Sequence, residues 1–462
     1  MVFYLLSIFI SLLFHSFCEC DISNGNRVSI SVPSTYKSGF EGRAYFIRAG
    51  EVVPSFKAAL SIEALDGRYL CALVVLFGEM EVWNSRRFSL FFPLELCVLE
   101  LMESGVLQLR DSSGRIGWRT GTSGQGVERL KLLRTGNLVL TDAKNNTKWQ
   151  SFDFPAHIML WGQRLYTPTR LTSVAADSTS LYSMEIQDEK IALYLNSGSL
   201  NYSYWELKPN KGQIIEFVEL GSTGLKLFSK RHRKVAQISS NSLEPIRFLA
   251  LGKTGNLEFY HYSLYKGKFE ASFQVLNGTC DLPLTCGPYG ICRSSNTCTC
   301  MQILNKTEHI QSECDEGLLD KFCESNVTVK MVELEGVTSV LRSAHPMINV
   351  SKEECTSLCA ADCSCASLLF SFGGVAGEQR ECFHYQLVGG VKQVEREVGV
   401  NYLIKVPQEL IDGRSRNSSS IKKWILIVGG VVNLLAVLFI LGGVVWYILT
   451  RKRKKATPRE NS

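Results

Sequence analysis

The stretch LLRTGNLVLTDAKNNTKWQSFDFP, residues 132–155, decides the fold, because its polar turn lies between two apolar runs. A Gly-Asn pair such as Gly136-Asn137 supplies the positive φ that a tight hairpin requires. Related phrases begin at Ser104 and Thr254, each with a small polar residue, a glycine and an alternating strand pattern. This recurrence predicts one domain built from similar hairpins and, because the third copy is distant, a second such domain.

The surrounding residues 21–275 consist of short β-branched and aromatic runs separated by Gly, Asn, Asp and Ser. Helical periodicity is weak there, so the sequence predicts a mainly β fold. The full chain of 462 residues is too long for one core. Its formal charge of +6 comes from residues 451–462 and from Lys422 and Lys423, which leaves the rest close to neutral. Nucleic acid is therefore not an expected partner.

Two apolar segments predict how the chain meets the membrane. The first opens the chain and is too short to span a bilayer, so residues 1–20 are interpreted as a signal peptide. The second, residues 424–450, is long enough to form a transmembrane helix, and the basic residues 451–462 after it predict a cytoplasmic tail. Residues 407–423 are expected to be a juxtamembrane stalk. The prediction is a single-pass type I plasma-membrane protein with its N-terminus outside.

Paired glycines at 429–430 and 442–443 lie within the predicted span. Small residues let transmembrane helices approach closely, so a homo- or hetero-dimer through this helix is one reading. Glycines are also common in spanning helices, so the oligomeric state stays open.

Without Cys18 and Cys20 of the signal peptide, fourteen cysteines remain, an even number suited to disulfides in an oxidising compartment. Cys71 and Cys97 stand apart and are expected to pair, whereas the connectivity of the two C-terminal groups stays open. No partnered histidine spacing accompanies these cysteines, so no metal site and no cofactor is expected. The predicted disulfide cysteines are Cys71, Cys97, Cys280, Cys286, Cys292, Cys298, Cys300, Cys314, Cys323, Cys355, Cys359, Cys363, Cys365 and Cys382.

Asn-x-Ser/Thr sequons occur only on the side of the chain predicted to lie outside the cell. Together with the signal peptide and the cysteine usage, this distribution predicts N-glycosylation. The predicted sites are Asn145, Asn201, Asn277, Asn305, Asn326, Asn349 and Asn417.

One short helix is expected in the last cysteine group. Ser351 can cap it, with Glu354 three residues later as the partner of a capping box. Cys355 and Cys359 would then lie on one helical face and could attach the helix to neighbouring strands.

The words TGNLVL and WQSFDFP, residues 135–140 and 149–155, resemble the bulb-type lectin domain of plant S-locus glycoproteins and S-domain receptor kinases. The cysteine block 280–300 resembles the EGF-like module of that family, and the block 355–365 resembles its PAN/apple module. The resemblance implies bulb-type lectin β-prism modules, a small disulfide-rich EGF-like module, an α+β PAN/apple module and one transmembrane helix. The implied boundaries are 21–168 for the lectin-like domain, 169–278 for a second S-locus glycoprotein-like β domain, 279–316 for the EGF-like module and 317–406 for the PAN/apple domain.

Members of that family hold mannose with the pattern Q-x-D-x-N-x-V-x-Y, which places donors and a carboxylate acceptor on one strand face. With Asn137 at the Asn position, the others are Leu133, Thr135, Val139 and Thr141, so only Asn and Val are kept. No copy has a carboxylate at the Asp position, so mannose binding in the family manner is not expected. The other two copies read Met102, Ser104, Val106, Gln108 and Arg110, and Gly252, Thr254, Asn256, Glu258 and Tyr260.

No glycine-rich phosphate loop, HRD loop or DFG sequence is present, in contrast to the receptor kinases of the family. No carboxylate pair for sugar cleavage can be recognised either, so no enzymatic activity is expected. The expected function is a kinase-less surface recognition protein, a ligand-binding co-receptor or decoy with a protein partner such as a receptor kinase. Two alternatives remain: adhesion between membrane and cell wall, with polysaccharide as partner, and sugar binding by an altered pocket.

The basic run and the tryptophans each allow a structural and a functional interpretation. The basic run 230–234 is expected to be a solvated hairpin tip, with contact to acidic polysaccharide as the alternative. Trp83, Trp149 and Trp161 are expected to pack in the core or against hairpins rather than to stack on a ligand.

Overall fold

The protein is described by a computed structural model that covers residues 21–50, 53–175, 180–198, 200–210, 212–240, 243–301, 314, 328–373, 379–394, 399–408 and 441–448. The signal peptide, most of the stalk and span, the tail, Cys323 and the sequons at Asn305, Asn326 and Asn417 lie outside these residues. Among the described residues, no helix has the length and apolar character needed to cross a bilayer.

The first three-sheet unit is formed by residues 22–150 and confirms the mainly β prediction. It has three four-stranded antiparallel sheets, with orders β1-β10-β11-β12, β2-β7-β8-β9 and β3-β4-β5-β6. The first three strands along the chain, β1, β2 and β3, each belong to a different sheet. The later strands complete these sheets in reverse order: β4–β6 join β3, β7–β9 join β2, and β10–β12 join β1. The strands are β1 (Ile22–Ser23), β2 (Arg27–Ser31), β3 (Glu41–Ala49), β4 (Phe56–Leu65), β5 (Arg68–Phe77), β6 (Met80–Asn84), β7 (Leu96–Leu101), β8 (Leu107–Asp111), β9 (Ile116–Arg119), β10 (Val127–Leu132), β11 (Leu138–Asp142) and β12 (Thr147–Gln150).

The second three-sheet unit, residues 158–274, repeats this topology with the orders β13-β22-β23-β24, β14-β19-β20-β21 and β15-β16-β17-β18. The short helix η1 (Ser151–Asp153) connects the two units. The strands are β13 (Ile158–Leu160), β14 (Arg164–Tyr166), β15 (Thr169–Val174), β16 (Leu181–Ile186), β17 (Ile191–Ser197), β18 (Leu200–Leu207), β19 (Phe217–Gly221), β20 (Gly224–Phe228), β21 (Lys234–Ser239), β22 (Ile246–Leu251), β23 (Leu257–Ser263) and β24 (Lys268–Gln274).

A cysteine-rich segment, residues 279–301, and a C-terminal unit, residues 328–408, follow. The C-terminal unit has the sheet β27-β34-β31-β32-β30 with one helix beside it, and β28 and β33 join the cysteine-rich hairpin in a second sheet. The elements are η2 (Thr279–Asp281), β25 (Gly290–Cys292), β26 (Cys298–Cys300), β27 (Val329–Leu334), β28 (Val337–Ser339), β29 (Arg342–Ser343), β30 (Met347–Ile348), α2 (Lys352–Ala361), β31 (Ser367–Gly373), β32 (Gln379–Tyr385), β33 (Val391–Gln393) and β34 (Val400–Pro407).

The helix α2 begins where the sequence predicts it. The Ser351 hydroxyl accepts a 3.1 Å hydrogen bond from the backbone N–H of Glu354. Cys355 bonds to Cys382 on β32, which attaches the helix to the sheet, and Cys359 bonds to Cys365 just beyond the helix. These disulfides lie in a small core between α2 and the sheet.

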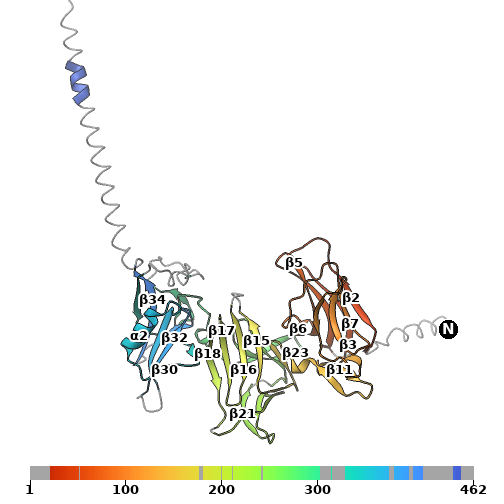
Figure 1. Cartoon of the computed structure of the whole chain (residues 1–462). Coiled ribbons are helices and arrows are strands. Elements are labelled where there is room, and N and C mark those ends of the chain that lie inside the picture. Colours follow the sequence, from red (N-terminus) through yellow and green to blue (C-terminus); the bar gives the residue numbers. More distant parts are fainter. Residues whose placement is uncertain are drawn as a thin grey trace, which may run out of the picture.

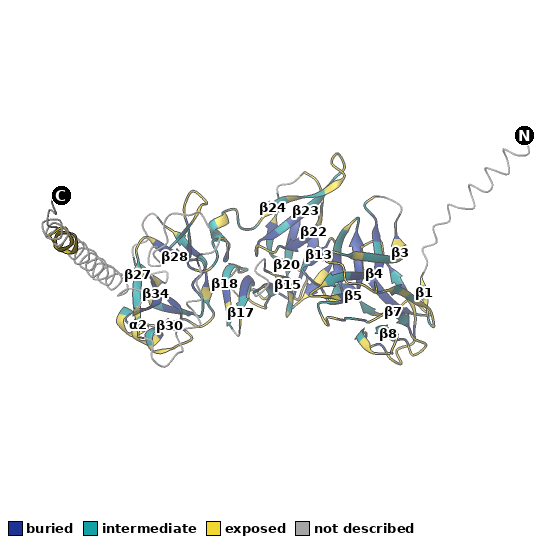
Figure 2. Cartoon of the chain, turned by 90° about the horizontal axis from the view of Figure 1, so that it is seen from above, coloured by how far each residue is buried: buried dark blue, intermediate teal, exposed yellow. Residues whose placement is uncertain are grey.

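The three units lie in a row, with the second three-sheet unit in the middle (Figures 1 and 2). The first unit has its own core, which also includes Phe248 and Ala250 of the second unit. A second core runs continuously from the second three-sheet unit into the C-terminal unit, for example through Tyr202 and Tyr385. Burial colours show dark interiors in all three units (Figure 2). Because apolar burial is continuous across the joints, the units are packed together rather than strung on open linkers.

Candidate functional site

The WQSFDFP word closes the first three-sheet unit. Trp83, Trp118 and Trp149 come from different sheets and form a mutual edge-on cluster with ring centroids 5.9–6.2 Å apart. The indole N–H of Trp83 donates a 2.8 Å hydrogen bond to the carbonyl of Phe154. Edge-on aromatic contacts are favourable, so this cluster fastens the three sheets to one another. Trp161, in contrast, is 49% exposed in the turn after β13, so of the two expected placements, core or hairpin surface, the core is excluded.

The three glycine turns share one geometry. Gly105, Gly136 and Gly255 have φ of +84°, +84° and +85°, as the hairpin interpretation requires. A Cβ at Gly136 would lie 2.5 Å from Phe56 Cε1 and 2.8 Å from Leu160 Cδ1. The turn at Gly136 therefore packs tightly where the two three-sheet units meet, and only glycine fits it.

Asn137, the retained Asn of the mannose pattern, is used inside the protein. It is buried, its amide N–H donates to Gln150 Oε1 at 2.8 Å, and its oxygen accepts from Ser151 Oγ and Phe152 N, both at 3.2 Å. These bonds tie the turn to the chain that leaves β12. Both the nitrogen and the oxygen of this amide are thus bonded within the scaffold.

The remaining positions of this copy offer little to a sugar. Leu133 and Thr135 are exposed, whereas Val139 and Thr141 are only 2% and 4% exposed. Among the described residues, the buried Thr141 hydroxyl has no hydrogen-bond partner. No carboxylate or amide reaches solvent from these positions, and a sugar needs such groups for its hydroxyls.

The two other copies differ from each other. In the earlier copy, Arg110 pairs with Glu100 at 2.8 Å, and Gln108 is buried. In the later copy, Asn256 repeats the internal role of Asn137, with 2.8 and 3.0 Å bonds to the backbone of Leu276. The remaining positions are Met102, Ser104 and Val106 on or near the β7–β8 turn, and Gly252 and Thr254 on the β22–β23 turn.

A polar cluster remains on the outer part of β23 and β24. Glu258 accepts a hydrogen bond from the Tyr260 hydroxyl and another, of 2.8 Å, from the Gln274 amide. Burial and the neighbouring Glu258 carboxylate raise the pKa of Tyr260. The carboxylate lies at the Val position of the pattern, not at the Asp position, so it does not restore the family arrangement.

The basic run 230–234 forms the tip of the β20–β21 hairpin, and all five residues are exposed. Among the described residues no carboxylate pairs with Lys230, Arg231 or Arg233. His232 has a φ of +53° and packs edge-on against Phe217 at 5.3 Å. In the fold, this run therefore lies at a solvated hairpin tip.

The structure joins the described cysteines in disulfides. Cys71 on β5 bonds to Cys97 on β7 and so links two sheets of the first unit. The cysteine-rich segment contains Cys280–Cys292 and Cys286–Cys298, and its Cys300 bonds to Cys314 beyond it. Cys363 is also disulfide-bonded. Cys355, Cys359, Cys365 and Cys382 gather near His384, but their sulfurs are already bonded to one another, so they cannot act as thiolate ligands.

Four of the predicted glycosylation asparagines, Asn145, Asn201, Asn277 and Asn349, lie among the described residues, and all are exposed. Glycosylation itself stays a prediction.

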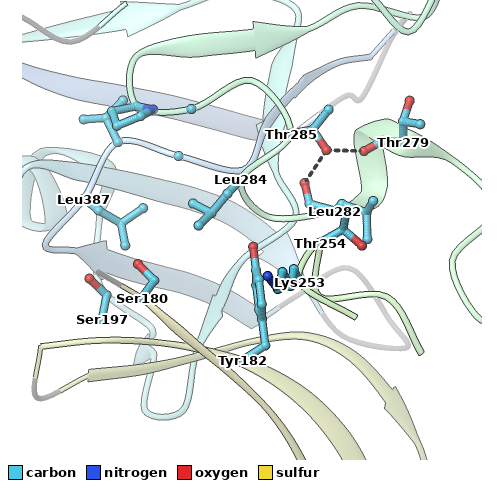
Figure 3. A pocket seen from close by; sticks show the side chains of 14 residues that line it. Ser180, Tyr182, Ser197, Lys253, Thr254, Thr279, Leu282, Leu284, Thr285 and Leu387 are labelled. Atoms are coloured by element: carbon cyan, nitrogen blue, oxygen red, sulfur yellow. Dashed lines mark hydrogen bonds between the residues drawn. The ribbon is translucent and has the colours of Figure 1, made fainter. Parts of the chain in front are cut away.

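A cavity of about 540 Å³ lies where the second three-sheet unit, the cysteine-rich segment and the C-terminal unit meet (Figure 3). Tyr182 and Lys253 reach into it from the second unit, whereas Leu284 and Leu387 face them from the other two parts. The full lining is Ser180, Tyr182, Ser197, Lys253, Thr254, Thr279, Leu282, Leu284, Thr285, Gly287, Pro288, Leu387, Val388 and Gly389. No local sequence signal marks this site, because its residues come from distant parts of the chain.

The walls of this cavity are held by contacts between the units. Strand β29 extends the sheet of the second unit by pairing with β18, and β25 pairs in parallel with β33. The Lys392 ammonium pairs with the Asp281 carboxylate at 2.8 Å. The Thr285 hydroxyl donates a 2.6 Å bond to the carbonyl of Thr279, which fixes the loop above the cavity (Figure 3). The cavity is thus a preformed feature of the assembled units.

Comparison with protein families identifies two domains. Residues 83–183 match the D-mannose binding lectin domain, and residues 196–307 match the S-locus glycoprotein domain. A solved structure of a monomeric monocot mannose-binding lectin from Gastrodia elata is 23% identical, covering 28% of this chain and 96% of that one, with a TM-score of 0.17.

Several curated plant proteins are similar over long stretches. A G-type lectin S-receptor-like serine/threonine-protein kinase of Arabidopsis thaliana is 25% identical, covering 60% of this chain and 34% of the relative. A PAN domain-containing protein of the same plant is 27% identical over 59% of this chain and 58% of the relative. A second kinase of the G-type lectin class is 24% identical over 97% of this chain and 57% of the relative. The chain thus spans between about a third and three fifths of the length of these relatives. The chain thus carries a lectin and an S-locus glycoprotein domain, and it is similar to plant G-type lectin S-receptor-like kinases and to a PAN domain-containing protein.

Proposed function

We propose that this chain is a non-enzymatic, single-pass plasma-membrane recognition protein that acts through a protein partner, as a ligand-binding co-receptor or decoy of a receptor kinase. The observation that carries the proposal is a contrast between two sites. Of the mannose positions, Asn137, Val139 and Thr141 are buried, and the exposed Leu133 and Thr135 carry no carboxylate or amide, whereas the cavity beside Lys253 is open and of ligand size. In this proposal, recognition uses the assembled units rather than the positions of the mannose pattern.

The domain scheme is part of this proposal. The lectin-like domain spans 21–168, the second β domain 169–278, the EGF-like module 279–316 and the PAN/apple domain 317–406. The similarity to a PAN domain-containing protein and the disulfides of residues 280–314 support the last two assignments. Residues 424–450 would anchor the chain, with the glycosylated part outside and the basic tail inside. The apolar run and the flanking charges support that placement.

The partner is tested by proximity labelling of the full-length chain in its native membrane. A receptor kinase should be enriched above a control bait, an unrelated single-pass surface protein carrying the same labelling enzyme. If no receptor kinase exceeds the control, the co-receptor and decoy roles are both lost.

Adhesion to the cell wall is the second candidate, and the exposed basic hairpin 230–234 favours it. The full chain should then be retained on pectate at low ionic strength and released as salt screens the charges. Substituting Lys230, Arg231 and Arg233 with alanine should abolish retention, whereas substituting Lys266 and Lys268 at another hairpin should not. Retention that persists in the first variant excludes this hairpin as the contact.

Sugar binding by an altered pocket is the third candidate, and the Glu258, Tyr260 and Gln274 cluster favours it. A glycan array tests it directly. A signal that disappears in Glu258→Ala would support it, and an array without signal would remove it.

A further inference from the structure

We infer that the cavity between the second three-sheet unit, the cysteine-rich segment and the C-terminal unit binds a small amphiphile whose acidic group pairs with Lys253. The ligand class is an apolar body carrying one carboxylate or similar anion. This inference rests on the proposed role as a ligand-binding surface protein and names the chemistry of its ligand.

The size and walls of the cavity suit such a body. Its volume of about 540 Å³ lies within the range of about 300–1,000 Å³ that small-molecule sites occupy. Leu282, Leu284 and Pro288 form the wall on the cysteine-rich side, and Leu387 and Val388 form the wall on the C-terminal side. Apolar surface on two sides favours an apolar ligand body because burying it removes that surface from water.

The one charged side chain in the cavity lining indicates which polar group the ligand carries. Lys253 is the one charged residue among those that line the cavity. Asp281, on the neighbouring helix η2, is paired with Lys392 at 2.8 Å. Among the described residues no carboxylate forms an ion pair with Lys253, so its ammonium is available to an anion from solution. An ammonium and a carboxylate form a charge-assisted hydrogen bond.

The charged group and the leucine side chains of the lining come from different parts of the fold, which gives the ligand a direction. Lys253, Ser180 and Ser197 come from the second three-sheet unit, whereas Leu284 comes from the cysteine-rich segment. The acidic group would therefore lie against the second unit and the apolar body against the other two parts. A ligand held in this way contacts all three and requires their native arrangement.

Little reorganisation is needed before binding. The Tyr202 hydroxyl accepts a hydrogen bond from Gln386, and Ile291 pairs with Val391, so the walls are fixed without a ligand. A preformed site avoids the free-energy cost of ordering its walls when the ligand enters.

The test uses the purified full-length chain and two photoreactive probes, para-benzoylbenzoate and its neutral carboxamide, with labelled peptides identified by mass spectrometry. The carboxylate probe should label peptides 282–288 and 387–389 about two- to fivefold more than the carboxamide, as expected for a partly exposed ion pair. Lys253→Met should remove this preference, and Lys253→Arg should keep it. Leu284→Trp, which fills the cavity, should lower labelling by both probes, and Lys266→Met should change nothing.

Labelling elsewhere with none at these peptides overturns the inference, as does equal labelling by the two probes in the unsubstituted chain. If the Lys253→Met chain still prefers the carboxylate probe, Lys253 is not the group that pairs with the anion. Since the readout is probe contact and not partner enrichment, failure here leaves the receptor-kinase experiment to decide the proposed function separately.

Discussion

The backbone N–H of Gln386 donates a 2.9 Å hydrogen bond to the hydroxyl of Tyr202, although the two residues belong to different units. Tyr202 is buried, and its ring lies 5.6 Å from that of Tyr385. Burial also raises the pKa of the Tyr202 hydroxyl, so it stays protonated at physiological pH. This contact fixes the joint beside the cavity.

Tyr202→Phe should destabilise that joint. The substitution leaves the Gln386 N–H without its partner, which costs about 1–2 kcal/mol of unfolding free energy. Urea unfolding of the full chain measures the loss, and Tyr265→Phe, at a side chain that is 97% exposed, is the control. Equal stability of the two variants would show that the bond contributes nothing.

Gly136→Ala should destabilise the joint between the two three-sheet units by about 2–5 kcal/mol, from left-handed backbone strain and overpacking against Phe56. Gly114→Ala is a matched control, because Gly114 has a φ of +87° and an added Cβ there would meet no atom within 4 Å. Gly114→Ala should lose only the free energy due to left-handed backbone strain, about 1–2 kcal/mol. If both variants lose the same free energy of unfolding, measured by heat or urea, overpacking against Phe56 does not contribute to the loss.

Asn137→Ala should lower stability by about 1–3 kcal/mol, since it leaves buried groups of the chain after β12 without partners. Thr135→Ala, at the exposed neighbouring position, should lie within about 0.5 kcal/mol of the unsubstituted chain. Denaturant midpoints measure both. A stable Asn137→Ala chain would contradict the structural role of the amide.

Acid should weaken the first three-sheet unit through Asp111. Hydrogen bonds from Ser113, followed by those from Arg115, lower the pKa of this carboxyl to about 2. An unfolded Asp titrates near pH 4, so the ionised form favours the folded state above about pH 4, and this stabilisation is lost as the pH falls toward 2. Urea midpoints between pH 7 and 2 should fall more steeply for the unsubstituted chain than for Asp111→Asn. Parallel curves would exclude Asp111 as the cause.

Local signals in the sequence predict local structure well here. The glycine turn at Gly136 and the capped helix after Ser351 both follow from neighbouring residues. The sheet order does not, because β1, β2 and β3 each pair with strands far along the chain. Trp161 was expected to pack in the core or against a hairpin, and it lies in an exposed turn. The residues around Trp161 do not distinguish this turn from a strand.

The cavity could not be predicted for a related reason. Lys253, Leu284 and Leu387 belong to three separate segments, and only the long-range pairings β18–β29 and β25–β33 bring these segments together. The sequence did indicate that the sugar positions were altered. It could not show that the Asn137 amide is bonded internally, because this depends on the backbone path of residues 150–152.

The lectin-like domain has the glycine turn of the mannose pattern but lacks its sugar contacts. Isothermal titration of the full-length chain with mannose tests it most directly. We expect no saturable heat up to millimolar sugar, for the unsubstituted chain and for Thr135→Ala alike. Saturable binding that is weakened by Thr135→Ala, a substitution expected to leave the fold intact, would contradict it.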